Sequence, residues 1–340
     1  MTQTELTTLL AAGSLRDLDL SGRELKGLDF GGCTLENVTF DACTLTGCCF
    51  DNCTLCRVSF RKAALRNCRF RRAAISWSDF RYSETERATF EEADIRFCDF
   101  YRAMLTGIVI MRKSRIADTS LYYTYFGEGV NIRRENLAGD RLLQQDYDKY
   151  RQFLVEWNTN GTGVRKNDRD NQSAWSPDAS LRSRWADAEE IYKNLNGLWT
   201  GTGFLRDANW AYVKGRRMER RRMLAQWRGT PPARKPELAW KIGTNLLMDI
   251  MFGYGESLLR MVATYVLLVL LFAYIFQGNA SLPSYLHAFW ISLKNMAGVG
   301  SEQLNGISPL VDMLNVLQTT LGILLTGIFG FILGNKIRNQ

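Results

Sequence analysis

Histidine is almost absent from this sequence, since His287 is the only one among 340 residues. This scarcity argues against metal sites built from several imidazoles and against any mechanism that needs two of them. The sequence also lacks a paired nucleophile and base, a glycine-rich loop that could hold a phosphate, and a set of metal ligands. We therefore expect neither an enzyme nor a bound metal or cofactor.

An export signal is missing as well, because the N-terminal segment MTQTELTTLLAAG has neither a basic start nor an apolar run. We expect the polar N-terminal part of the chain to stay in the cytoplasm. All eight cysteines lie between Cys33 and Cys98. In a reducing compartment such a cluster indicates packing or metal binding and not a disulfide framework.

A period of five residues runs through the first third of the chain. Every fifth residue from Leu15 to Ile110 is apolar, and Thr85 alone breaks the column. The residue two positions earlier is usually small, and this slot holds six of the eight cysteines: Cys33, Cys43, Cys48, Cys53, Cys68 and Cys98. Neither a helix nor a flat strand has this period, so the pattern indicates a stacked solenoid.

The pentads CTLEN, CTLTG, CTLCR, AALRN and ADIRF make the sequence resemble the pentapeptide-repeat family. The resemblance implies a right-handed quadrilateral β-helix over residues 13–128, with residues 1–12 as its N-terminal cap and four pentads per coil. Coils would stack at about 4.8 Å, which places residues twenty apart in ladders. Two aromatic ladders on opposite sides are expected, one of Phe30, Phe50, Phe70 and Phe90, the other of Phe40, Phe60, Phe80 and Phe100. After Ile110 the register slips by one residue.

The chemistry of the solenoid surface limits its partners. Cys53 and Cys56 could form a metal knuckle, but the first occupies an inward slot and the second an outward one, so packing is favoured. Residues 1–130 contain 17 Lys or Arg and 17 Asp or Glu. This balance disfavours DNA mimicry, and nucleic acid is not an expected partner. The repeats are expected to serve a cytoplasmic ligand or protein that the sequence does not name.

The middle of the chain, residues 129–235, reads as a cytoplasmic helical linker. Helical spacing predicts a helix over 140–157, then a loop, then helices over 188–199 and 204–227 that form an antiparallel hairpin. The last helix carries a basic group that is expected to contact anionic lipid or solvent: Arg216, Arg217, Arg220, Arg221 and Arg222. Nucleic acid binding is the alternative for this group. Residues 236–256 resemble an interfacial helix along a bilayer.

Two uncharged stretches, 261–276 and 313–333, have the length and composition of transmembrane helices. A buried core helix is the alternative for the first. Two spans place both termini on one side, and the basic residues before the first span and after the second make that side the cytoplasm. The localisation expected is a bacterial inner membrane, with residues 257–340 as an α-helical two-span pore domain.

The segment 283–300 between the spans is a short apolar helix that runs into a glycine-rich loop. Here the chain resembles the two-span, pore-loop family of potassium channels. The resemblance makes a selectivity filter of Met296, Ala297, Gly298, Val299 and Gly300, acting through backbone carbonyls. The second span has a small and polar stripe that would line the pore: Asn315, Thr319, Gly322, Thr326 and Gly330. Close packing through small residues is the alternative reading of that stripe.

These patterns favour a homotetrameric channel for monovalent cations in the lipid bilayer, gated or targeted through the cytoplasmic repeats. A sharper version makes it a defence effector that depolarises the cell. The alternative is a membrane-anchored adaptor that conducts nothing. The filter departs from the family pattern T-V-G-Y-G at Met296, Ala297 and Val299, so we expect potassium and sodium to permeate with similar ease.

Overall fold

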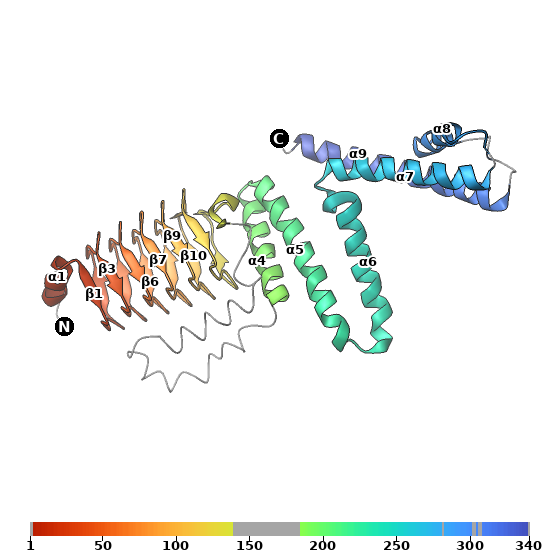
Figure 1. The fold of residues 1–340 in the computed structure, drawn as a ribbon. Helices are drawn as coiled ribbons and strands as arrows, with labels where there is room; N and C mark the ends of the chain where they lie inside the picture. Colours follow the sequence, from red (N-terminus) through yellow and green to blue (C-terminus); the bar gives the residue numbers. More distant parts are fainter. Residues whose placement is uncertain (1–2, 139–183, 281, 301–303, 305–307, 339–340) are drawn as a thin grey trace. The chain divides into compact units, whose positions relative to one another are not determined.

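A computed structural model describes residues 3–138, 184–280, 282–300, 304 and 308–338. The chain divides into two compact units, Met1–Ala225 and Gln226–Gln340, and each is described by itself. The first unit contains the strands and a helical hairpin (Figure 1). The second is helical. The boundary between them falls earlier than the predicted end of the linker at residue 235.

The strands of the first unit are short, and most hold one buried apolar residue between two more exposed ones. They are β1 Ser14–Arg16, β2 Glu24–Lys26, β3 Thr34–Glu36, β4 Thr44–Thr46, β5 Thr54–Cys56, β6 Ala64–Arg66, β7 Ala74–Ser76, β8 Glu84–Glu86, β9 Asp94–Arg96, β10 Met104–Thr106, β11 Val109–Ile110, β12 Arg115–Ala117, β13 Tyr125–Phe126 and β14 Val130–Asn131.

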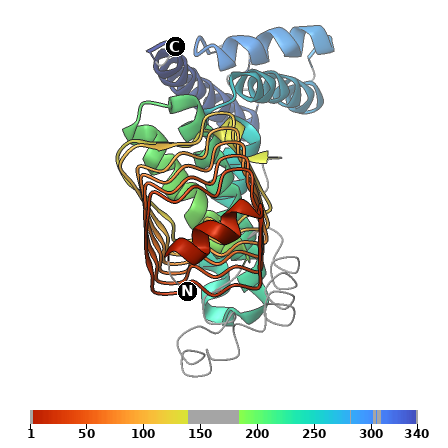
Figure 2. The ribbon, with the colours of Figure 1, turned by 90° about the vertical axis from the view of Figure 1, so that its left-hand side faces the viewer.

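The strand pairings among the described residues are parallel, and they build two six-stranded sheets, β1-β3-β5-β7-β9-β12 and β13-β10-β8-β6-β4-β2, and the pair β11-β14. Leu15, Leu35 and Leu55 are paired in register, which confirms a repeat of twenty residues and four pentads per coil. Viewed nearly end-on, the coils superpose as four-sided outlines (Figure 2). The solenoid prediction is therefore confirmed.

The core of the solenoid is built from the two predicted phenylalanine ladders. Within one ladder the rings of Phe30 and Phe50 stack with centroids 4.6 Å apart, and within the other Phe40 and Phe60 stack at 5.1 Å. The ladders also meet edge to face, as Phe30 and Phe40 do at 5.7 Å. Both arrangements are favourable geometries for aromatic pairs, and these rings are 0% exposed.

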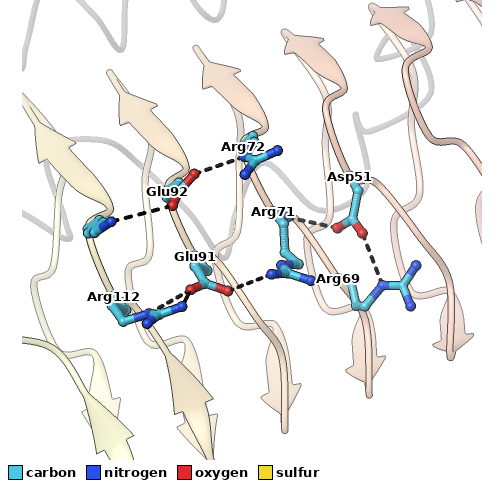
Figure 3. A network of polar contacts seen from close by, with 8 residues as sticks. Asp51, Arg69, Arg71, Arg72, Glu91, Glu92 and Arg112 are labelled. Carbon is cyan, nitrogen blue, oxygen red and sulfur yellow. Dashed lines mark hydrogen bonds and ion pairs between the residues drawn. The ribbon is translucent and has the colours of Figure 1, made fainter.

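Charged side chains form cross-coil pairs on the outside of the solenoid. Arg72 donates to Glu92 at 2.8 Å, and Arg71 pairs with Glu91 at 3.0 Å (Figure 3). Arg112 also pairs with Glu91 from the following coil. The pair of Arg72 and Glu92 is partly exposed and adds little stability, whereas Glu91 is buried. The alternation of charge from coil to coil does keep like charges from stacking at the spacing of neighbouring strands.

The solenoid ends later than residue 128, which corrects the predicted boundary. Pairing shifts to an offset of 21 residues at the last coil, where Ile95 meets Ile116, as the register slip predicted. A further bridge joins Ile116 to Leu137. Asn136 fixes this end, because its buried amide donates to the carbonyls of Met111 at 2.7 Å and Ser114 at 3.0 Å. At the other end helix α1, Gln3–Ala11, covers the first coil with buried Leu6.

The predicted hairpin is present as α4, Arg184–Gly201, and α5, Leu205–Gln226. Trp199 is fully buried and donates from Nε1 to the carbonyl of Ile132 at 2.7 Å. The apolar core runs without interruption from the solenoid into these helices. The hairpin is therefore part of the solenoid unit and caps its C-terminal end. A 3-10 turn, η1 Arg134–Asn136, precedes it, and the helix predicted over 140–157 lies outside the described residues.

The second unit starts with two 3-10 turns, η5 Trp227–Gly229 and η6 Pro232–Arg234. Helix α6, Lys235–Phe252, covers most of the segment 236–256 that was predicted to be interfacial, and η7, Gly253–Gly255, follows it. The remaining helices are α7 Leu258–Asn279, α8 Tyr285–Met296 and α9 Pro309–Arg338. Two of the described helices, α7 and α9, are long and apolar enough to cross a membrane.

Candidate functional site

The helical unit holds the short helix α8 against the two long helices α7 and α9 (Figure 1). One buried apolar cluster lies along its first turns: Phe272, Ala273, Phe276, Ala280, Ala288, Ile291, Leu304 and Val311. A second lies at its C-terminal end: Phe252, Met261, Val269, Met296 and Leu325. The hydroxyl of Ser284 caps the N-terminus by accepting the N–H of His287 at 3.3 Å. With 12 residues, α8 is too short to cross a bilayer.

The loop after α8 begins as a glycine-dependent helix cap. The N–H of Gly298 donates to the carbonyl of Asn295 at 2.9 Å, and the N–H of Val299 donates to that of Lys294 at 3.1 Å. This is the Schellman arrangement, which needs a left-handed residue, and Gly298 supplies it with φ +80°. Gly300 is also left-handed, at φ +72°. Left-handed glycines thus occupy two positions of the predicted filter, 298 and 300, where other residues would be strained.

Met296 differs from the rest of the predicted filter in its surroundings. Met296 is the last residue of α8, and its side chain is fully buried beside Met261 and Leu325. Its carbonyl oxygen lies against Gly322 of α9, so close that an added Cβ there would lie 2.3 Å from it. Met296 therefore belongs to the packed helix. Ala297, Gly298 and Val299 are exposed, and Gly300 is half-buried.

The predicted pore-lining stripe of α9 divides into two parts. Asn315 and Gly322 are buried within the subunit and Thr319 is half-buried, whereas Thr326 and Gly330 are exposed. Gly322 packs closely against α8, as in the alternative that the sequence left open, and a pore-lining role for the stripe stays a prediction. The N-terminal part of the stripe is thus buried or half-buried within the subunit, and its C-terminal part is exposed.

A buried polar network that the sequence did not indicate connects the three helices. Ser292 donates from Oγ to the carbonyl of Val269 in α7 at 2.8 Å. Gln318 of α9 donates from Nε2 to the carbonyl of Ser292 at 3.1 Å and to its Oγ at 2.5 Å. Asn295 donates from Nδ2 to Oε1 of Gln318 at 3.2 Å. All three side chains are 0% exposed, and Oδ1 of Asn295 has no hydrogen-bond partner among the described residues.

A tight elbow joins α6 to α7. Nη1 of Arg260 donates to the carbonyl of Asp249 at 2.8 Å and to its carboxylate at 3.0 Å. Tyr254 donates to Oδ1 of Asn245 at 2.7 Å and has a left-handed backbone, with φ 57°. Such a backbone costs a non-glycine residue energy and persists only where its surroundings hold it. The elbow is therefore a defined connection between these two helices.

Three of the five residues in the predicted basic group of α5 have described partners within the hairpin. Arg216 pairs with Glu219 at 2.5 Å, and Arg222 pairs with Glu189 of α4 at 2.8 Å. Arg221 lies over the ring of Trp185 at 4.9 Å, while Arg217 and Arg220 make other contacts. These contacts stabilise the hairpin. A membrane-surface role for the group stays a prediction.

A cavity of about 380 Å³ lies where the end of the solenoid meets α5. It is lined by Arg133, Arg134, Glu135, Leu137 and Asp207. Arg133 donates from Nε to Asp207 at 2.6 Å and lies over the ring of Phe204 at 3.7 Å, so its guanidinium has a fixed orientation. This cavity is a candidate place for a small ligand in the solenoid unit.

The cysteines are arranged for packing. Cys53 is buried and donates to the carbonyl of Phe30 at 2.8 Å, whereas Cys56 is half-exposed. Burial raises the pKa of the Cys53 thiol to about 12. Among the described residues no group of three or more His, Cys, Asp or Glu side chains could hold a metal ion.

Residues 23–100 match the family model described as "Pentapeptide repeat region". This chain carries a pentapeptide-repeat domain. Similar solved structures include HetL from the cyanobacterium Nostoc sp. (14% identity, TM-score 0.20, covering 36% of this chain and 70% of HetL). Another is a pentapeptide repeat protein of the Arabidopsis thaliana thylakoid lumen (18%, 0.17, 41% and 77%), and a third is Rfr23 from the cyanobacterium Cyanothece (14%, 0.14, 41% and 100%).

These identities and TM-scores carry no argument about function. No curated protein matches the chain. The pentapeptide-repeat domain rests on the family match together with the register of its coils. The helical unit lies outside the matched residues, so its role has to be argued from its own geometry.

Proposed function

We propose that this protein is the subunit of a homotetrameric monovalent-cation channel of a bacterial inner membrane, with its pentapeptide-repeat domain and both termini in the cytoplasm. The observation that carries the proposal is the loop 297–300. It follows a short helix held between two helices of spanning length, and it has left-handed glycines at alternate positions. Glycine adopts these left-handed conformations without strain, so the loop can turn its backbone carbonyls in directions that other residues do not allow, and such a filter replaces the hydration shell of an ion with backbone carbonyls.

The exposed surface of the helical unit supports a membrane location. Of the most apolar stretches, 22% of α7 and 17% of α9 are buried, whereas a core helix of a soluble protein would be mostly buried. Large apolar side chains are exposed along both helices, as for Leu259 at 80% and Phe331 at 71%. Exposing such apolar surfaces to water is unfavourable, whereas the hydrocarbon of a lipid bilayer would cover them favourably.

The loop also requires partner subunits. A single loop cannot surround an ion, and Val299 at its tip is 74% exposed in the subunit. Thr326 and Gly330, the exposed part of the α9 stripe, would line the pore below it. Four copies around an axis would bring the loops together, as in the pore-loop family that the sequence resembles. We expect the pentapeptide-repeat domain to gate or target the channel, with the cavity beside Arg133 and Asp207 as a place for a ligand.

The test is conductance of the purified full-length protein in planar bilayers, together with its mass in detergent. We expect unitary cation currents and a particle of four subunits. Gly298→Asp should abolish the currents, because the substitution places a charged side chain and a strained backbone in the loop. Gly278→Ala, in α7 where an added Cβ meets nothing within 4 Å, should retain them. A silent protein, or a stable monomer or dimer, would favour a membrane-anchored adaptor.

A further inference from the structure

Gln318 of α9 is connected to the glycine loop, residues 297–300, through one intermediate residue, Asn295. Its Oε1 accepts Nδ2 of Asn295 at 3.2 Å, and the backbone carbonyl of Asn295 accepts the N–H of Gly298 at 2.9 Å. Asn295 is therefore held by its side chain while its main chain holds the first glycine of the loop. Gln318 and Asn295 are both fully buried, whereas Gly298, which Asn295 holds, is exposed.

The contact is braced on both sides. Nε2 of Gln318 bonds Ser292 twice, and Ser292 in turn bonds the carbonyl of Val269 on α7. One turn further along α9, Gly322 touches the backbone of Met296, and Ile323 lies 3.1 Å from the Cβ position of Gly298. The last turn of α8 and the start of the loop thus rest against one face of α9. Side chains fixed in this way can hold a site to within fractions of an ångström.

A purely structural reading of the network is less economical. Buried polar groups in an apolar surrounding cost free energy unless each is paired, and Asn295 keeps an unpaired Oδ1 among the described residues. Apolar residues of the same shape would pack the three helices without that cost. A polar network that is retained although incomplete is better explained by the geometry that it imposes on the loop.

We propose that Gln318 is a positioning residue for the glycine loop: by fixing Asn295 it holds Gly298 and Val299 in the conformation that sets which cations pass. This inference rests on the proposed channel function. It assigns to α9 a role in ion choice, beyond that of lining the pore. The residue would act through Asn295 and would not touch the ion.

The experiment compares full-length wild type with Gln318→Met, which keeps the length of the side chain and removes its amide. Gln277→Met is the matched control, because Gln277 is a half-buried amide of α7 that bonds only the carbonyl of Leu282 at 3.1 Å among the described contacts. The first readout is hydrogen exchange of the segment 295–300 in detergent. We expect at least about threefold faster exchange in Gln318→Met and no change in Gln277→Met.

The second readout is the potassium-to-sodium permeability ratio from reversal potentials in bilayers. We expect a change of at least about threefold in Gln318→Met, with the particle mass unchanged. Ser292→Ala removes the hydroxyl but leaves the bond from Gln318 to the carbonyl of Ser292, so it should give a smaller change in the same direction, and it carries the test if Gln318→Met fails to assemble.

The two hypotheses fail in different ways. Currents with an unaltered permeability ratio and unaltered exchange in both Gln318→Met and Ser292→Ala would overturn the positioning role. A wild-type protein without currents would overturn the channel function instead, and the exchange rates would still decide whether Gln318 holds the loop.

Discussion

Gly322 lies so close to Met296 that a methyl group added to it would be 2.3 Å from the carbonyl oxygen of Met296 and 2.6 Å from its Cα. Real Cβ atoms do not approach a backbone this closely, so α8 and α9 would have to separate. This contact depends on glycine at position 322, and it sets the distance between α8, which precedes the loop, and α9. The first prediction tests it.

Gly322→Ala should destabilise the helical unit by roughly 1–3 kcal/mol or more, the usual cost of overpacking. Gly327→Ala is the control in the same helix, because an added Cβ there meets nothing within 4 Å, and it should be neutral or stabilising by up to about 1 kcal/mol. Thermal denaturation of the full-length protein in detergent measures both. Equal melting temperatures for the two variants would contradict the close contact.

Thr85 is the one polar residue in the apolar column of the pentapeptide-repeat domain. It is 0% exposed, it pairs in register with Leu65 and Leu105, and its hydroxyl has no hydrogen-bond partner among the described residues. Thr85→Val should therefore stabilise the domain by about 1 kcal/mol. Thr124→Val should do the opposite, because the hydroxyl of Thr124 donates to the carbonyl of Phe100 at 2.9 Å.

Calorimetry of the full-length protein should show opposite shifts of the solenoid transition for these two variants. For a unit of this size a change of 1 kcal/mol corresponds to about 2–4 °C. A lower transition temperature for Thr85→Val would mean that the hydroxyl makes a stabilising contact after all.

Glu189 gives the hairpin a dependence on pH. Burial raises the pKa of this carboxyl, but hydrogen bonds from Lys193 at 2.6 Å and Arg222 at 2.8 Å lower it by more, so that the pKa lies below its ordinary value of 4.5. A lowered pKa in the folded state means that the stabilisation is fully present above pH 4.5 and is lost as the pH falls through the lowered value.

We expect Glu189→Gln to destabilise the hairpin at neutral pH and to reduce the loss of stability on acidification below pH 4.5. Tryptophan fluorescence follows this unfolding, because Trp199 and Trp210 lie in the hairpin core. A wild type and a variant with parallel pH profiles would show that Glu189 contributes nothing in its charged form.

The regular part of the fold was predictable because each pentad repeats the same pattern of small, polar and apolar residues. Phe30 and Phe50 could be placed in one ladder since every coil has the same length. The end at Leu137 was not predictable, because Asn136 closes the last coil through bonds to Met111 and Ser114 that follow no repeat. Tertiary hydrogen bonds take over where the pattern stops.

In the helical unit the sequence predicted the four long and short α-helices, but it did not predict which faces of these helices pack against one another. Gly322 was taken as part of a pore-lining stripe, and its contact with Met296 depends on the position of α8, which spacing along α9 does not contain. The sequence did not identify Gln318, because a single glutamine in an apolar helix belongs to no repeat or motif. Its partners Ser292 and Asn295 are identified only when the two helices are placed together.

The last prediction concerns ion choice in the proposed channel. In the potassium-channel pattern that the loop resembles, a tyrosine packs against the pore helix and holds the filter open. Val299 stands in that position, is 74% exposed in the subunit and is too short to provide such support. Met296 has a thioether and no hydroxyl to offer the loop, and its side chain is buried among Met261, Val269 and Leu325. The loop carbonyls are therefore braced mainly through the backbone bonds to Lys294 and Asn295.

We expect potassium and sodium permeabilities to differ by less than about tenfold, or about 1.4 kcal/mol. Under bi-ionic conditions the reversal potential should then stay well short of the Nernst limit for potassium. A potential near that limit would show that other contacts, such as those through Gln318, are sufficient to make the loop selective without the tyrosine.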